Sequence, residues 1–278
     1  MKSKIHEHSK NNILFVSKKI KLLSVFAILV IALGFYACSG NDETAKTQAN
    51  CLPTNLQNGI IAFYPFSNGS INDFSGNNYN LTNTTTAVAG ADRAGNPNCA
   101  YNFIKANNEF LKYTNPTFID NFQTLPFSIS LWYKPTGTWS FECLIGRDTG
   151  GHCPDTHGQW SVALYDIRKP VFGINQRALW FSEGVNHNPA NYNNVWQHLV
   201  ATCIGNDLKL YRNGILSPNG ISDGTGSNCN PPSQPTLNIG DLFLGKDYNG
   251  LLDDVIIYNR VITPTEVTEL YNLSPCCQ

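Results

Sequence analysis

The sequence predicts an all-β sandwich followed by one short helix, and two observations support this fold class. The chain has 278 residues, of which 42% are hydrophobic, 12% aromatic and only 14% charged. That aromatic content can form a large core, which argues against disorder. Apolar and polar residues alternate in short segments separated by Gly, Asn, Asp and Pro, a pattern typical of strands joined by turns.

Six segments have this strand pattern, and in chain order they are 59–66, 127–133, 159–165, 197–204, 207–212 and 251–258. In 127–133 apolar residues occupy every second position, which predicts that one face of this strand is buried. Hairpin turns are expected at Gly205-Asn206 and at Asn213-Gly214, because these residues tolerate positive φ.

One helix is expected after the last strand. Thr263 and Glu266 have the spacing of a capping box, and Pro264 stands at the first helical position. Val267 and Leu270 are spaced to form one apolar stripe, which would pack the helix on the sandwich.

The N-terminal region predicts export from the cytoplasm. Lys18, Lys19 and Lys21 precede the apolar run 22–37, which ends at Cys38. Basic residues followed by an apolar run are the layout of a secretory signal. The run is shorter than the roughly 20 residues that a membrane-spanning helix needs.

Cys38 stands where a bacterial lipoprotein signal has its acylated cysteine, although two aromatic residues precede it. An ordinary signal peptide and an uncleaved anchor are the alternatives. We predict a signal peptide at 1–37, a lipidated Cys38 with a flexible tether over 38–50, and one domain at 51–278. The protein would be secreted across the inner membrane as an outer-membrane lipoprotein, periplasmic or cell-surface, with the lipid as its only membrane contact.

The charge balance excludes one class of partner. Lys and Arg number 19, Asp and Glu 20, and the formal net charge is -1. Nucleic acid needs clustered Lys and Arg to neutralise its phosphates, and the sequence has no such cluster. The polar surface must come from Asn, Ser, Thr and Gly instead.

The nine cysteines indicate an oxidising compartment. Removing Cys38 leaves an even set for disulfides: Cys51, Cys99, Cys143, Cys153, Cys203, Cys229, Cys276 and Cys277. Local spacing favours Cys143–Cys153. It also favours Cys203–Cys229, which leaves Cys51 to reach Cys276 or Cys277. The alternative is that one or two of the eight remain free thiols.

Several motifs in a fixed order resemble those of a known family. They are 60–66, 72–77, 100–103, 127–132, 196–202, 208–214 and 250–260, followed by the helix. Together they resemble a LamG-like (laminin G-like) domain of the concanavalin A-like lectin/glucanase superfamily. The resemblance implies a jelly roll of two antiparallel sheets over most of 58–272.

The resemblance also implies a structural calcium ion (Ca2+). Its ligands would be Asp73, Asn77 and Asp253 or Asp254, which offer the oxygen atoms that calcium takes. The alternative for Asp73 is an Asx-turn that binds its own backbone. A second metal-like segment, 152–157, contains His, Cys and Asp, but a disulfide from Cys153 is favoured over zinc there.

The carboxylates do not predict catalysis. Glycoside hydrolysis needs two carboxyl groups across the scissile bond. Five glutamates are scattered singly: Glu109, Glu142, Glu183, Glu266 and Glu269. Asp253 and Asp254 are adjacent on a strand and should point to opposite faces. We expect His198 to pack with Trp196 as a structural pair, and we predict that the protein is not an enzyme.

The side chains expected to bind ligand are those that suit sugars, namely Trp139, Trp160, Trp180, Tyr165 and Arg147. Rings stack on sugar C–H groups, and planar polar groups satisfy hydroxyls. Trp132 and Trp196 are assigned to the core instead. The sequence therefore predicts a non-catalytic module that binds a glycan or a cell-envelope or extracellular protein. The alternatives are an adhesion module and a glycoside hydrolase or polysaccharide lyase.

Overall fold

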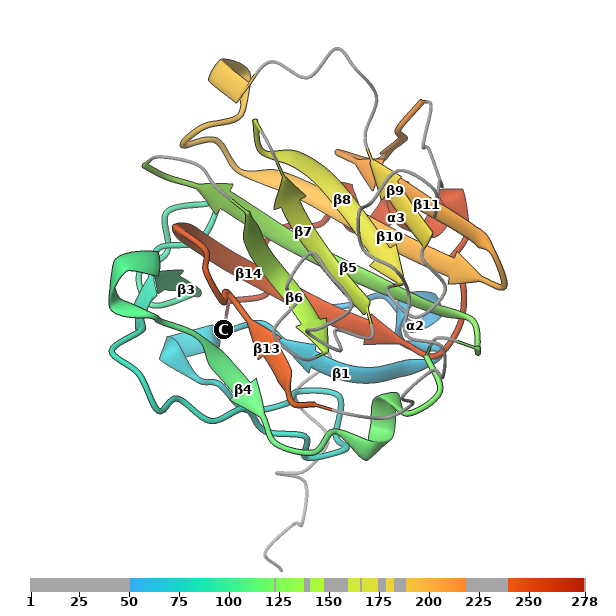
Figure 1. Ribbon diagram of the computed structural model, residues 1–278. Coiled ribbons are helices and arrows are strands. Elements are labelled where there is room, and N and C mark those ends of the chain that lie inside the picture. The colour runs from blue at the N-terminus through green and yellow to red at the C-terminus, as the bar shows by residue number, and fades with distance from the viewer. Residues whose placement is uncertain are drawn as a thin grey trace, which may run out of the picture. The chain divides into compact units, whose positions relative to one another are not determined.

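The computed structural model shows a β-sandwich whose two sheets are antiparallel (Figure 1). The structure describes residues 51–277 except 123, 138–140, 148–159, 166, 175–178, 183–188 and 219–239. The predicted signal peptide, Cys38 and the tether lie outside these residues. Among the described residues, no helix combines the length and apolar character that a membrane crossing requires.

Sheet A has eight strands within the described residues, in the order β12-β11-β10-β5-β14-β3-β2, with β1 also paired to β14. Their bounds are β1 (Ile60–Tyr64), β2 (Val88–Gly90), β3 (Ala100–Phe103), β5 (Phe127–Pro135), β10 (Gln197–Ile204), β11 (Asp207–Arg212), β12 (Ile215–Leu216) and β14 (Gly250–Tyr258).

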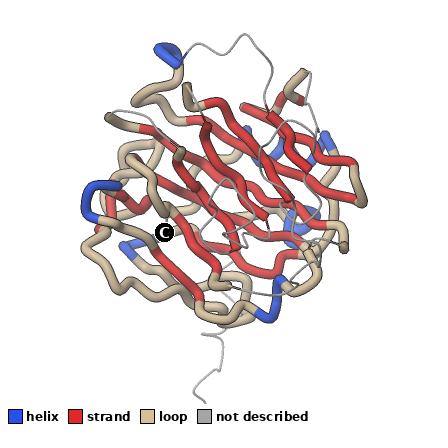
Figure 2. The backbone as a smooth tube through the Cα atoms, in the orientation of Figure 1, coloured by secondary structure: helices blue, strands red, loops and turns tan. Residues whose placement is uncertain are grey.

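Sheet B has six strands within the same residues, in the order β4-β13-β6-β7-β8-β9. Their bounds are β4 (Leu111–Tyr113), β6 (Glu142–Arg147), β7 (Trp160–Tyr165), β8 (Lys169–Ile174), β9 (Leu179–Ser182) and β13 (Leu242–Leu244). Helices are short and lie outside the strands (Figure 2): α2 (Thr54–Gln57), α3 (Pro264–Asn272) and the 3₁₀ turns η1 (Ser67–Gly69), η2 (Lys105–Asn107), η3 (Thr117–Ile119) and η6 (Pro189–Asn191).

The main core lies between the sheets. Alternate residues of β5, beginning at Phe127 and Ile129, enter it, and the ring of Phe127 packs against Trp160 and Phe172 of sheet B. All six segments predicted as strands contain a strand, and both predicted turns join neighbouring strands. The predicted fold class is therefore confirmed.

The outer face of sheet A is also buried, which the alternation in 127–133 did not predict. A second core forms there as α2 and α3 cover the sheet with Leu56, Val267 and Leu270. Polar β5 residues on this face are buried with partners, and Ser128 Oγ donates to Arg260 O at 2.8 Å. The capping box of α3 is confirmed, since Thr263 Oγ1 accepts from Glu266 N.

Two disulfides attach the C-terminal tail to the rest of the domain. Cys51 pairs with Cys276, one of the two partners expected for it, and Cys99 pairs with Cys277. Loops closed over 225 and 178 residues constrain the unfolded chain strongly, and each such disulfide contributes roughly 2–5 kcal/mol.

The two disulfides predicted from local spacing are Cys143–Cys153 and Cys203–Cys229. Cys143 is a buried free thiol beside Gly146, so the disulfide predicted with Cys153 is not formed. Burial raises the pKa of the Cys143 thiol to about 12. Cys203 is buried in β10, and its expected partner Cys229 lies outside the described residues, as does Cys153.

Candidate functional site

A buried ion pair joins three loops at one end of sheet B. Arg168 Nε donates to Glu142 Oε2 at 2.8 Å, and both side chains are almost fully buried. The same guanidinium donates to Thr136 O at 2.6 Å and to Asn193 Oδ1. Burial raises the pKa of Glu142, and the guanidinium opposes that shift. The pair holds the chain after β5, the turn after β7 and the segment before β10 together.

Tyr165 lies at the start of the turn after β7, which the ion pair holds in place. Its side chain is 43% exposed at the end of β7, and its ring packs edge-on against Phe141 with centroids 6.5 Å apart. Asn193 and Asn194 are exposed in the segment before β10, which is tied to the same loops because Asn193 Oδ1 accepts from Arg168 and Asn194 N donates to the last residue of β5 at 2.7 Å. We call Phe141, Tyr165, Asn193 and Asn194 the loop surface. It offers two aromatic rings, of which Tyr165 is the exposed one, and two amides on a held backbone.

Two residues expected to bind ligand lie in the interior instead. Trp160 is fully buried, with ring centroids 5.9 Å from Phe122 and 5.5 Å from Phe127. Arg147, its cross-strand partner, is also fully buried, and its Nη1 donates to Asp120 Oδ1 at 2.7 Å. The apolar ring is more stable in the core, and the charged head is paired there. Neither side chain is placed to meet a ligand at the surface.

The other two predicted tryptophans, Trp139 and Trp180, fall wholly or partly outside the described residues. Trp139 lies outside the described residues. Trp180 belongs to β9, where its backbone pairs with Gly173, and its side chain lies outside what is described. Of the core assignments, Trp132 is buried, whereas Trp196 is only half-buried.

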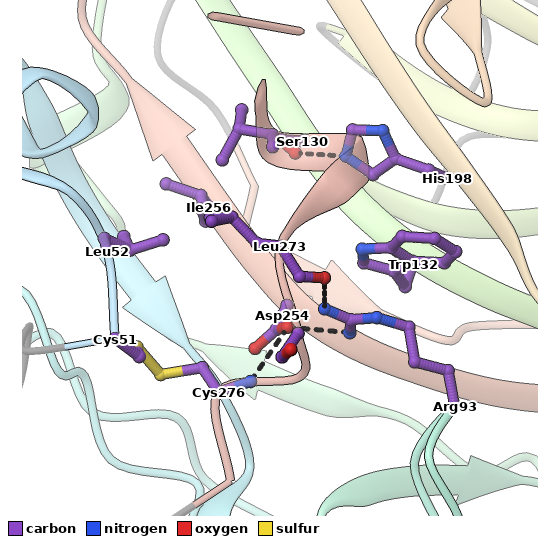
Figure 3. A pocket seen from close by; sticks show the side chains of 12 residues that line it. Cys51, Leu52, Arg93, Ser130, Trp132, His198, Asp254, Ile256, Leu273 and Cys276 are labelled. Atoms are coloured by element: carbon purple, nitrogen blue, oxygen red, sulfur yellow. Dashed lines mark hydrogen bonds and ion pairs between the residues drawn. A yellow bond between two sulfur atoms is a disulfide. The ribbon is translucent and has the colours of Figure 1, made fainter. Parts of the chain in front are cut away.

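A buried charged cluster lies beneath the C-terminal tail (Figure 3). Arg93 Nη1 donates to Asp253 Oδ2 at 2.9 Å and to Asp254 Oδ2 at 2.7 Å. The tail completes the cluster, since Arg93 Nη2 donates to Leu273 O and Cys276 N donates to Asp254 Oδ2. Burial raises the pKa of both aspartates, while the guanidinium opposes the shift.

The two aspartates approach one cation because β14 is irregular. Its register with β5 shifts between Asp253 and Ile256, and Asp254 has a left-handed φ of 45°. A bulge of this kind breaks the strict alternation of faces along a strand. The prediction that the two side chains point to opposite faces is therefore wrong.

His198 belongs to the same buried region. Its Nε2 lies 3.0 Å from Ser130 Oγ, and its ring packs on Trp132, the residue opposite it in β5, at 5.1 Å. The ring partner is thus Trp132, and the pairing expected with Trp196 is not the one formed. Burial, aided by the charge of Arg93, lowers the pKa of His198 to about 3. A neutral, covered imidazole of this kind serves packing.

The cavity at this cluster is too small for a sugar. Its volume is about 10 Å³, and it is lined by Arg93, Trp132, Asp254 and the Cys51–Cys276 disulfide among others (Figure 3). A volume of that size holds about one water molecule. The cluster therefore holds the tail on sheet A, and it offers no room for a substrate.

The Asp73 loop has the contacts of a folded turn. Asp73 Oδ1 accepts from Phe63 N and Ser75 N, and Oδ2 accepts from Ser75 Oγ and Tyr79 N, all within 3.0 Å. Asn77 Nδ2 donates to Ile61 O at 2.8 Å. These bonds are those of the Asx-turn alternative.

The expected calcium ligands have protein partners in the described part of the chain. The Asp73 oxygens accept from N–H and O–H donors, and Oδ2 of both Asp253 and Asp254 contacts Arg93. The described group of three metal-ligating side chains is Asp92, Cys99 and Cys277, and its two cysteines are joined in a disulfide. The donors present do not fit calcium in this arrangement, and calcium binding stays a prediction from the resemblance.

Sequence reasoning missed Arg93 and Arg168. Each is a lone arginine in a loop, with no spacing that singles it out. Their partners are 160 and 26 residues away in the chain, and only the folded sheets bring them together.

Comparisons with known proteins agree with this architecture. The family Laminin_G_3, described as the concanavalin A-like lectin/glucanases superfamily, matches residues 109–268, more than half of the chain. No curated protein matches the chain in sequence.

Solved structures are similar in fold at low identity. A structure of botulinum neurotoxin type C, whose cell entry depends on two ganglioside molecules, is 16% identical with a TM-score of 0.57 and covers 78% of this chain. The binding domain of Paraclostridial Mosquitocidal Protein 1 is 20% identical with a TM-score of 0.55. This chain spans only 52% of the length of each of these two proteins.

A third similar structure is matched over almost its whole length. Domain 4 of an extracellular GH43 arabinanase from Geobacillus stearothermophilus, solved with arabinotriose, is 19% identical with a TM-score of 0.53. The match covers 77% of this chain and 98% of that domain. At these identities the likeness shows the fold alone. With the ordered motifs, the sandwich and the family match in agreement, the chain belongs to the Laminin_G_3 family of the concanavalin A-like lectin/glucanases superfamily.

Proposed function

We propose that this protein is a non-catalytic glycan-binding module. The observation that carries the proposal is the loop surface, where Tyr165 is 43% exposed and the exposed Asn193 is hydrogen-bonded to Arg168, three residues after Tyr165. An aromatic face packs against sugar C–H groups, and amides donate to and accept from hydroxyls. The Arg168–Glu142 pair holds these loops before ligand arrives, which lowers the entropy lost on binding.

The similar structures support this choice of ligand. The arabinanase domain was solved with arabinotriose, and the botulinum toxin interacts with gangliosides. A chain with 14% charged residues and a net charge of -1 suits a neutral ligand better than a polyanion.

The described carboxylates support a role without catalysis. Glu142 is paired with Arg168, Glu109 accepts from Ile104 N at 2.7 Å, and Glu266 caps α3. Asp253 and Asp254 lie under the tail beside a cavity of about 10 Å³. Glycoside hydrolysis uses two carboxyl groups across the scissile bond, whereas these carboxylates are engaged by protein donors or enclosed under the tail.

The proposal includes a membrane tether. A lipid on Cys38 followed by residues 39–50 would place the domain outside the inner membrane, on the periplasmic side or at the cell surface. Replacing Cys38 with Ala should move the protein from the membrane fraction to the soluble fraction. Mass spectrometry of the mature N-terminus should then show no lipid. Unchanged fractionation would contradict the anchor.

Glycan binding is tested with the full chain in detergent against arabinotriose, xylotriose, mannotriose and N-acetylchitotriose by calorimetry. We expect Tyr165→Ala to weaken binding about fivefold, since a ring contact is worth about 1 kcal/mol. Ile215→Ala is the matched control, because Ile215 is 73% exposed on another edge. Release of shorter sugars would overturn the non-catalytic assignment. Silence on every glycan together with capture of a protein would overturn the glycan assignment.

A further inference from the structure

Three half-buried aromatic rings gather at the other end of the sandwich. Tyr79 stacks on Phe118 with centroids 4.0 Å apart and planes 12° apart, and Tyr113 meets both rings edge-on. They come from the loop after β1, from η3 and from the end of β4. All three pack against the main core while remaining partly exposed. We call them the ring cluster.

The ring of Tyr79 is held in place through its backbone. Tyr79 N donates to Asp73 Oδ2 at 3.0 Å, and Tyr79 O accepts from Tyr64 Oη at 2.8 Å. Asp73 is itself fixed by Phe63 N of β1. Asp73 therefore positions Tyr79, and the cluster loses little freedom when a flat ligand packs on it.

The surroundings of the cluster are polar and neutral. Five exposed amide or hydroxyl residues flank the three rings in sequence, namely Asn78, Asn80, Thr114, Asn115 and Thr117. The nearby charges cancel, since Lys112 Nζ lies 3.3 Å from Asp241 Oδ2. Rings surrounded by amides and hydroxyls, without exposed aliphatic groups among these flanking residues, match a sugar better than an apolar protein surface.

We propose that the ring cluster is a second contact site for neutral oligosaccharides, separate from the loop surface. The inference rests on the proposed glycan-binding function, but it depends on neither Tyr165 nor the Arg168–Glu142 ion pair. Figure 1 shows the separation, because the end of β4 lies low in the view and the end of β7 lies high. One domain can then contact two sugars or two parts of one chain. Two linked contacts raise the apparent affinity for a polymer far above that for a trimer.

The experiment measures the four trisaccharides of the panel on the full chain, read by calorimetry and by aromatic ¹H–¹³C NMR. Variants are Tyr79→Ala, Tyr165→Ala and the double variant. Tyr79→Phe keeps the ring and is the conservative control, and it guards against a loss that comes from misfolding. We expect each single Ala variant to retain binding at the other site. The double variant should lose it, and Tyr79→Phe should stay within about threefold of the original.

The outcomes separate the two proposals. If adding a trisaccharide to the Tyr165→Ala variant shifts the ring signals of Tyr79, Tyr113 and Phe118, the ring cluster binds sugar without the loop surface. Complete loss of binding in Tyr165→Ala, with unshifted cluster signals, would overturn the second site and leave the proposed function intact. Binding that survives Tyr165→Ala but not Tyr79→Ala would move the only site to the ring cluster. No binding by the original chain to any trisaccharide would overturn both.

Discussion

The charged cluster at Arg93 and the ring cluster at Tyr79 differ in what surrounds them. Arg93, Asp253 and Asp254 are covered by the tail and leave a cavity of about 10 Å³. Tyr79, Tyr113 and Phe118 are partly exposed among amides and hydroxyls. In these two clusters the charged groups are enclosed with their partners, whereas the uncharged rings keep exposed surface.

The physical reason is the cost of desolvating charge. A buried guanidinium or carboxylate is tolerated only with partners, and those partners fill the space that a substrate would need. An aromatic ring has no such requirement, so it can remain half-covered at little expense in free energy. The following changes test this contrast, from the largest expected effect to the smallest.

Replacing Arg93 with Ala should give the largest effect. It leaves two buried carboxylates without their cation, which costs about 3–5 kcal/mol in the free energy of unfolding. Denaturant unfolding measures this loss. Lys209→Ala is the control, because its exposed pair with Asp207 contributes at most about 1 kcal/mol. Equal effects of the two variants would contradict the role given to the cluster.

Removing the disulfide between Cys51 and Cys276 by changing both to Ser should cost roughly 2–5 kcal/mol. Trisaccharide affinity should stay the same, because the disulfide lies at the face of sheet A that the C-terminal tail covers, away from both proposed binding surfaces. A reductant should lower the melting temperature of the original chain by breaking its disulfides. Cys143→Ala is the matched control: Cys143 is a free thiol, so this variant should respond to the reductant as the original chain does. A large fall in affinity would show that the tail-covered face of sheet A contributes to binding.

Acid should destabilise the domain through His198. Its pKa falls from 6.5 to about 3 on folding, so the unfolded state alone takes the proton between these values. Stability is therefore lost as pH falls below 6.5, by about 2 kcal/mol at pH 5. The raised pKa values of Asp253 and Asp254 make these carboxyl groups stabilise the folded state as pH falls, which opposes the effect of His198. This contribution is present in both the original chain and the His198 variant. Unfolding curves of His198→Asn should show a shallower acid dependence, and an identical slope would contradict this reading.

Calcium should have the smallest effect. The Asp73 oxygens already accept four hydrogen bonds, so we expect the melting temperature to change little between excess Ca²⁺ and a chelator. A clear rise with Ca²⁺ that disappears in Asp73→Asn would instead support the ligand set implied by the family resemblance.

The sequence by itself determined the local elements. Alternation predicted the strands, Asn213-Gly214 predicted a turn, and Thr263 with Glu266 predicted the start of α3, because each depends on neighbours a few residues away. The ordered motifs predicted the jelly roll, and the even cysteine count predicted disulfides, of which Cys51–Cys276 was one expected possibility.

Only the tertiary structure decided which faces are covered. The alternation in 159–165 places Trp160 on one face with Val162 and Leu164, but only the packing of the two sheets shows that this face enters the core. Nothing near Asp253 and Asp254 in sequence shows that a bulge turns both toward Arg93. The ring cluster joins three segments that lie apart in the chain, so no local sequence pattern contains it. Pairing and burial depend on contacts across the sheets, and these exist only once the strands have paired and the tail has closed over sheet A.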